Sequence, residues 1–204
     1  MKALLIDTTK KQANILVVKD DNFKIYNMSD KIKHSEGLFL YLEKALLDSS
    51  MELSDFDYLS AVVGPGSFTG IRVGMSVVIG LNRVLNKKII PLNMFEILSE
   101  EINNGVILLN STMTACYYAI IKSGKIIEMG CVEKNNIDSK FADNKIFILK
   151  EEQGEFGDKY NVITDVEKLY FKALTKKIES GDVGVFEPLY LQLSQAERNL
   201  NDKG

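Results

Sequence analysis

The stretch of the sequence with the most distinctive chemistry is Gly64–Gly74, which begins Gly-Pro-Gly-Ser-Phe-Thr-Gly. Its density of glycine and proline suits neither a helix interior nor a central strand, so it predicts a tight turn between a strand and a helix. Such a turn exposes backbone N–H groups at a helix N-terminus, where an anion is favoured. The stretch lacks the lysine of a Walker A loop and the spacing of a dinucleotide-binding fingerprint. Composition alone favours a simpler role, in which the turn lets the helix pack closely on the strand.

A second group of polar residues, Asp7-Thr8-Thr9, closes the first predicted strand. A carboxylate and two hydroxyls at a strand end have the chemistry to bind a metal–phosphate, which makes these three residues the cofactor-binding candidates. The same residue types also cap hairpins, and this structural role is the favoured interpretation.

The remaining residues that often carry chemistry are few. His34 is the single histidine, so the chain cannot supply a two-histidine metal site, and no Gly-x-Ser-x-Gly elbow presents a serine. We therefore predict no metal site and no catalytic residue, and His34 is interpreted as an ordinary helix-start residue. Cys116 and Cys131 stand apart in apolar stretches, which favours buried, reduced thiols.

The elements that position these residues follow from the hydrophobic pattern. Strands are predicted at residues 2–7, 13–19, 23–28, 57–63 and 89–90, with helices at 34–47 and 70–85. Short turns join the first three strands, so these must be antiparallel, whereas the later strands flank a helical crossover. The first half therefore predicts a mixed α/β sheet with helices on its faces.

The second half repeats this order more loosely. Strand candidates lie at residues 106–109, 115–121, 125–132, 146–149 and 162–163, and a helix is expected over 165–180. The polar stretches 133–144 and 150–159 are predicted loops.

The second predicted helix has an unusual set of glycines. Gly70 and Gly74 are four residues apart and share one helix face, where missing side chains let another helix approach closely. Glycine in a helix interior costs about 1 kcal/mol relative to alanine. Close packing is the simplest compensation for Gly74 and Gly80.

Composition limits the class of protein. A chain of 204 residues makes one large domain or two small ones. Its net charge of −3 is unlike that of a protein that grips a nucleic-acid backbone unaided. The start resembles no signal peptide, and the longest apolar run, Val73–Leu81, is shorter than the roughly 18 residues of a membrane helix. We expect a cytoplasmic protein that does not associate with membranes.

At Gly64–Gly74 the sequence resembles the signature of the TsaB (YeaZ) family of bacterial tRNA threonylcarbamoyladenosine biosynthesis proteins. Ala3–Thr9, Lys33–Glu36 and Pro188–Leu191 followed by Gln195–Glu197 resemble further family landmarks. Two segments depart from the family pattern. Pro91–Glu96 replaces a Val-Ser-Ser-Leu-Glu-like run, and Asn110-Ser111-Thr112 replaces an Asp-Ala-Arg strand.

The resemblance implies the actin-like ATPase (ASKHA) fold of two RNase-H-like halves. It implies an N-terminal subdomain with dimerisation helices at residues 1–103 and a smaller subdomain at 104–204. It also implies a non-catalytic partner, without a cofactor, of the related subunit TsaD, which carries a paired-histidine metal site and modifies N6 of adenosine 37 in tRNA. It further implies that the chain helps to recruit the ATPase TsaE and contacts tRNA indirectly, and interface helices usable by both partners would permit a homodimer when TsaD is absent.

We hypothesise that the helices at 34–47 and 70–85 pack against the corresponding helices of the partner. The predicted interface residues are Leu38, Tyr41, Leu42, Gly70, Arg72, Gly74 and Val77. One alternative is a self-standing ATPase or kinase-like enzyme that uses Asp7 and Gly64–Gly70 on phosphates. A metallopeptidase is the other, and a single histidine argues against it.

Overall fold

The computed structural model describes residues 1–29, 34–181 and 183–192, without the side chains of His34 and Ser35. Lys33 and Gln195–Glu197, which contribute to the family resemblance, lie outside these residues. The chain forms two compact units that are not consecutive segments. Among the described residues, those of Met1–Met94 and Tyr170–Leu189 make the first unit, whereas Phe95–Leu169 and residues 190–192 make the second.

The first unit is built on a five-stranded sheet in the order β3-β2-β1-β4-β5. Its strands are β1 (Lys2–Asp7), β2 (Asn14–Lys19), β3 (Asn22–Asn27), β4 (Tyr58–Val62) and β5 (Lys88–Leu92). The first three strands are antiparallel, and β4 and β5 continue the sheet parallel to β1. The predicted mixed sheet, a meander followed by a crossover, is confirmed.

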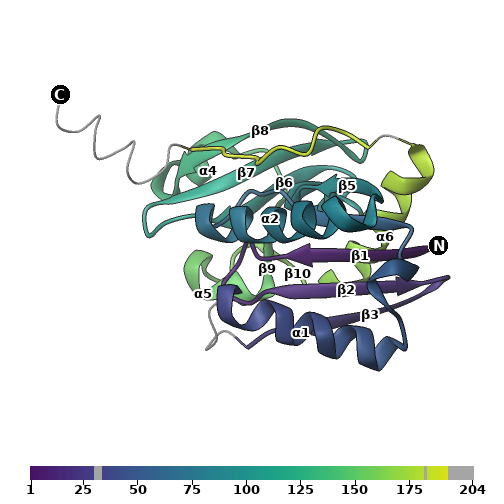
Figure 1. Cartoon of the computed structure of the whole chain (residues 1–204). Coiled ribbons are helices and arrows are strands. Elements are labelled where there is room, and N and C mark those ends of the chain that lie inside the picture. The colour runs from purple at the N-terminus through teal and green to yellow at the C-terminus, as the bar shows by residue number, and fades with distance from the viewer. Residues whose placement is uncertain (30–33, 182, 193–204) are drawn as a thin grey trace. The chain divides into compact units, whose positions relative to one another are not determined.

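Helices α1 (His34–Ser49) and α2 (Phe68–Leu85) lie side by side on one face of this sheet, in front of the strands in Figure 1. α1 buries the stripe that contains Leu38, Leu42 and Ala45. The Ser67 side chain caps the start of α2 by accepting a hydrogen bond from Gly70 N at 3.2 Å. Both helices begin and end within two residues of the predicted ranges, 34–47 and 70–85.

The other face of the sheet carries α6 (Val166–Ser180), whose residues from Tyr170 onward belong to the first unit. Successive strand residues point to opposite faces. Ile6 of β1 lies under α2, and its neighbour Asp7 contacts Tyr170 of α6. Phe171 of α6 also stacks on Phe23 of β3 with ring centroids 4.9 Å apart.

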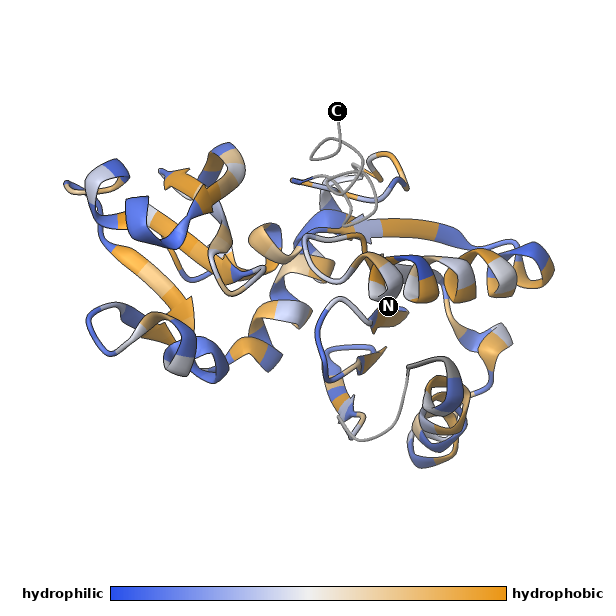
Figure 2. Ribbon diagram, turned by 90° about the vertical axis from the view of Figure 1, so that its left-hand side faces the viewer, coloured by the Kyte–Doolittle hydropathy of each residue, from blue (hydrophilic) through white to orange (hydrophobic). Residues whose placement is uncertain are grey.

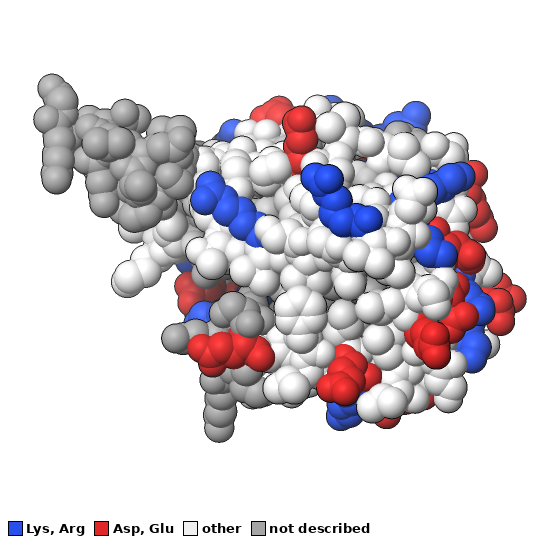
Figure 3. All heavy atoms as spheres, in the orientation of Figure 1, with Lys and Arg blue, Asp and Glu red and all other residues white. Residues whose placement is uncertain are grey.

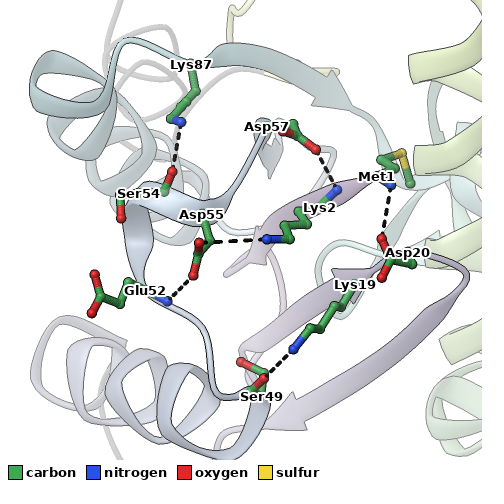
Figure 4. A network of polar contacts seen from close by, with 10 residues as sticks. All are labelled: Met1, Lys2, Lys19, Asp20, Ser49, Glu52, Ser54, Asp55, Asp57 and Lys87. Atoms are coloured by element: carbon green, nitrogen blue, oxygen red, sulfur yellow. Dashed lines mark hydrogen bonds and ion pairs between the residues drawn. The ribbon is translucent and has the colours of Figure 1, made fainter.

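A polar network fixes the short 3₁₀ turn η1 (Leu53–Asp55) against the start of β1 (Figure 4). Asp55 Oδ2 accepts a hydrogen bond from Glu52 N at 2.9 Å, which holds the pKa of Asp55 below its usual value. Lys87 Nζ donates to Ser54 O at 2.9 Å, and Lys2 N donates to Asp57. Because these groups are exposed, each bond adds little stability, and together they set the position of η1.

The second unit repeats the strand order in a second sheet, β10-β9-β6-β7-β8. The strands are β6 (Gly105–Asn110), β7 (Ala115–Lys122), β8 (Lys125–Glu133), β9 (Ile146–Leu149) and β10 (Asn161–Ile163). β6 occupies the central place that β1 holds in the first sheet, with the same mixture of antiparallel and parallel pairs. The predicted architecture of two RNase-H-like halves is confirmed.

The helices of the second unit are short. α3 (Met94–Ser99) starts in the first unit and continues into the second, and the predicted loops contain η2 (Lys134–Asn136), α4 (Ile137–Lys140), η3 (Lys150–Glu152) and α5 (Gln153–Phe156). Ile137 and Phe141 join Tyr118 in the core. Cys116 is buried there as predicted, and burial raises the pKa of its thiol to about 12, whereas Cys131 is half-buried.

Figure 2 shows the strands mostly as hydrophobic stretches and the longer helices as alternating hydrophobic and hydrophilic bands. The helices are therefore amphipathic, and the direction in which each apolar stripe faces decides which residues remain available for binding.

Candidate functional site

The end of β1 brings together the three cofactor-binding candidates, Asp7, Thr8 and Thr9, all of which are buried. Asp7 Oδ1 accepts hydrogen bonds from Thr9 N at 2.8 Å and Thr9 Oγ1 at 2.6 Å, and Oδ2 accepts one from the Tyr170 hydroxyl. Both carboxylate oxygens thus have partners within the chain. Three of the roughly four lone-pair sites of the carboxylate are therefore used within the chain.

The glycine-rich turn packs directly against this strand end. Ser67 N donates to Thr9 O at 2.8 Å, and Thr8 Oγ1 donates to Gly70 O at 2.6 Å. A Cβ on Gly70 would collide with the carbonyl oxygen of Thr8. The geometry therefore matches the packing role that the composition of the turn favours.

Gly70 and Gly74, predicted to lie at a partner interface, are buried on the inner side of α2. A Cβ on Gly74 would lie 2.5 Å from Thr8 Oγ1. The argument that these glycines admit an external helix is wrong, because the close approach that they permit is to β1 of the same unit. Of the other predicted interface residues on α2, Arg72 is exposed and Val77 is half-buried.

The predicted interface residues on α1 also lie mainly on its inner side. Leu38 and Leu42 are only 1% and 3% exposed, so they serve the core of the first unit. Tyr41 is half-buried, and its hydroxyl accepts a hydrogen bond from Ser29 N at 3.4 Å. An apolar stripe on an amphipathic helix predicts that the stripe is buried, without saying against what. In α1 the stripe packs on the sheet of the same unit.

The outer side of the two helices presents a different set of residues. They line an apolar groove of about 410 Å³, which we call the α1–α2 groove; its residues are Phe39, Leu53, Ser76, Val77, Gly80, Leu81, Val84 and Leu85. Phe39 is 59% exposed and Val84 is 85% exposed. Further exposed apolar side chains on the same helices are Leu40, Leu47 and Ile79. A cluster of large apolar side chains that are exposed to solvent is typical of an interaction site.

The sequence does contain a signal for this groove. α2 is apolar around more of its circumference than its buried residues occupy, since Ile79 and Val84 are exposed. Among the described residues, α2 is the one helix long and apolar enough to span a membrane, and 28% of that stretch is buried inside the chain. The expectation that no segment reaches this length counted only uninterrupted apolar runs, whereas α2 includes Arg72 and Arg83.

Charge is arranged around the groove rather than in it. Figure 3 shows a broad area without Lys, Arg, Asp or Glu in the middle of the face that carries α1 and α2. Exposed charges on α2 are Arg72 and Arg83, whereas those on α1 are Glu36, Glu43, Asp48 and Lys44. The apolar surface thus has a basic side and a mainly acidic side.

A family model described as tRNA N6-adenosine threonylcarbamoyltransferase (TsaD) matches residues 29–152, which is more than half of the chain. The chain belongs to this family. The match includes both α1 and α2. Within the described part of the chain, no three His, Cys, Asp or Glu side chains cluster as metal ligands would.

Curated relatives carry two names. A tRNA threonylcarbamoyladenosine biosynthesis protein TsaB from Buchnera aphidicola is 29% identical over 100 residues, covering 48% of this chain and 47% of that protein. A tRNA N6-adenosine threonylcarbamoyltransferase from Kosmotoga olearia is 26% identical over 109 residues, covering 46% and 33%. The chain therefore spans about half or less of the length of these relatives.

Among solved structures, YeaZ from Pseudomonas aeruginosa superposes with a TM-score of 0.71 at 18% identity, covering 93% of this chain and 99% of that chain. This similarity extends the shared fold across both units. The resemblance to TsaB (YeaZ) is thus supported both by curated relatives and by fold.

Proposed function

We propose that this chain is a non-catalytic subunit that binds a TsaD protein and supports it in forming N6-threonylcarbamoyladenosine at position 37 of tRNAs that read codons beginning with A. The observation that carries the proposal is the exposed α1–α2 groove. Burying one large apolar side chain contributes about 1.5–3 kcal/mol, so a partner that covers Phe39 and Val84 gains substantial binding energy.

Family membership supports the choice of partner. The TsaD model matches the region that contains α1 and α2, so a TsaD protein has counterparts of both helices. Two related faces of this kind can pack helix against helix, with the basic side of one beside the acidic side of the other. A second copy of the chain is the substitute partner when TsaD is absent.

The division of labour follows from the residues of the chain. A single histidine supplies no paired-histidine metal site, and both oxygens of Asp7 accept hydrogen bonds within the chain, from Thr9 and Tyr170. We assign the chemistry to TsaD and the recruitment of TsaE to the assembled complex. The net charge of −3 favours tRNA binding mainly by a partner in the cytoplasm.

The proposal is tested by measuring the affinity of the purified chain for TsaD of the same organism by calorimetry. Val84→Glu places a charge in the groove and is expected to weaken binding at least about 30-fold. The matched control is Met113→Glu, which changes an apolar residue that is 93% exposed on the second unit. Unchanged binding by Val84→Glu would contradict the proposal.

The alternative enzyme is tested in the same preparation. A self-standing ATPase predicts ATP turnover by the chain alone that Asp7→Ala abolishes. A subunit without chemistry of its own predicts no such turnover, and stimulation of threonylcarbamoyladenosine formation only when TsaD is present.

A further inference from the structure

Three glycines of α2, Gly70, Gly74 and Gly80, stand in different surroundings. A Cβ on Gly70 would collide with Thr8 O, and one on Gly74 would lie 2.5 Å from Thr8 Oγ1, so packing within the unit requires both glycines. Gly80 is exposed, and a Cβ there would meet nothing within 4 Å. The fold therefore gives no reason for glycine at position 80.

Glycine in this position has a definite disadvantage. It lies in the interior of an 18-residue helix, where alanine is more stabilising because it restricts the unfolded chain and shields the backbone. Gly80 also lines the α1–α2 groove. We therefore look for the reason for glycine at position 80 in the molecule that occupies the groove.

The shape of the groove identifies the kind of occupant. Ser76, Gly80 and Val84 form one i, i+4 row on α2, and Val77, Leu81 and Leu85 form the row beside it. The first row has a small side chain at Ser76 and none at Gly80, whereas the second row has larger apolar side chains. The low row beside the high one forms a channel into which the ridge of another helix fits. No charged residue lines the channel, so the ridge that enters it must be apolar.

We propose that Gly80 is the point of closest approach between α2 and a helix of the partner, and that a large apolar side chain of that helix inserts beside it. This inference rests on the proposed function, because the occupant is taken to be a helix of TsaD. The family match across α1 and α2 is the reason for choosing that occupant, since TsaD has counterparts of these helices.

The experiment measures stability and affinity in the same variants of the full chain. Gly80→Ala is expected to raise the melting temperature, by about 2–4 °C for a chain of this size, while weakening binding to TsaD of the same organism. Gly80→Leu fills the channel and is expected to weaken binding at least about 10-fold while the chain remains folded. Opposite signs for stability and affinity distinguish an interface glycine from a merely tolerated one.

Gly154 of α5 provides the matched control, because a Cβ there also meets nothing within 4 Å and it lies outside the groove. Gly154→Ala and Gly154→Leu are expected to leave affinity unchanged. If Val84→Glu weakens binding and both Gly80 variants bind like the wild type or more tightly, the inference about Gly80 is overturned and the proposed function stands. If the wild-type chain does not bind TsaD, the proposed function fails and the inference fails with it.

Discussion

The two units share one strand order but differ greatly in their helices. In the first unit, α1 has 16 residues and α2 has 18. At the corresponding places in the second unit, α4 and α5 have four residues each. The sheets are nevertheless both five-stranded, with a central strand between an antiparallel meander and parallel strands.

This comparison separates what the fold needs from what binding needs. In the second unit, Ile137 of a four-residue helix and Phe141 complete a core cluster against which Phe156 and Tyr160 also pack, so this cluster is covered with little helix. The longer helices of the first unit bury one side and leave Phe39, Ile79 and Val84 exposed on the other. The additional helical length therefore supplies the α1–α2 groove, which is the surface proposed to bind TsaD.

Phe141→Ala tests how the core of the second unit is covered, and it is expected to have the largest effect on the free energy of unfolding. Phe141 is 2% exposed, and its ring centroid lies 5.1 Å from that of Tyr118. Removing it should lower the free energy of unfolding by about 3–5 kcal/mol, measured by urea denaturation. The half-buried Phe156 serves as control, because Phe156→Ala should cause a smaller loss. An equal effect of both substitutions would show that cover is distributed rather than concentrated in Phe141.

Gly70→Ala tests the inner packing of the first unit. The added methyl group collides with the backbone at Thr8, which cannot move aside as a flexible side chain would. We expect a loss of about 3 kcal/mol in the free energy of unfolding, at the upper end of the usual range for overpacking. Gly80→Ala on the same helix is the control, with the opposite sign. A stable Gly70→Ala variant would contradict the close contact between the turn and β1.

Asp7→Asn makes the end of β1 resemble the end of β6, which already has Asn110 at the corresponding place. The amide nitrogen replaces one carboxylate oxygen and cannot accept, so the variant loses either the bond from Tyr170 or the two bonds from Thr9. A loss of about 1–3 kcal/mol is expected by thermal and urea unfolding. Tyr170→Phe should remove part of the same interaction, so the double variant should lose less than the sum of the two single variants. Additive losses would indicate that the two residues act independently.

Much of the fold could be predicted from the sequence because strand patterning is local. The apolar runs around Leu4, Ile107 and Ile148 each became strands within one or two residues of the expected ends. The short helices α4 and α5 were missed, since four polar-rich residues carry no helical period. Their helical form depends on tertiary contacts, which no local pattern encodes.

The candidate site was predicted less well, because a sequence shows which residues share a helix face and not where that face points. Gly70 and Gly74 do share a face, as predicted, but it packs on Thr8. The outer face became identifiable only when the inner one had been assigned. Gly80 does not share this contact, because a Cβ there would meet nothing within 4 Å.

The bond between Tyr170 and Asp7 joins residues 163 positions apart, and this affects how the protein is made. During synthesis the first sheet emerges before α6, which covers its second face. A nascent chain that stops just before Tyr170 contains strands β1 to β10 and still leaves Phe23 without Phe171 and Asp7 without Tyr170. Shortened chains that lack α6 are therefore open at the first sheet, where chaperones and proteases can recognise them.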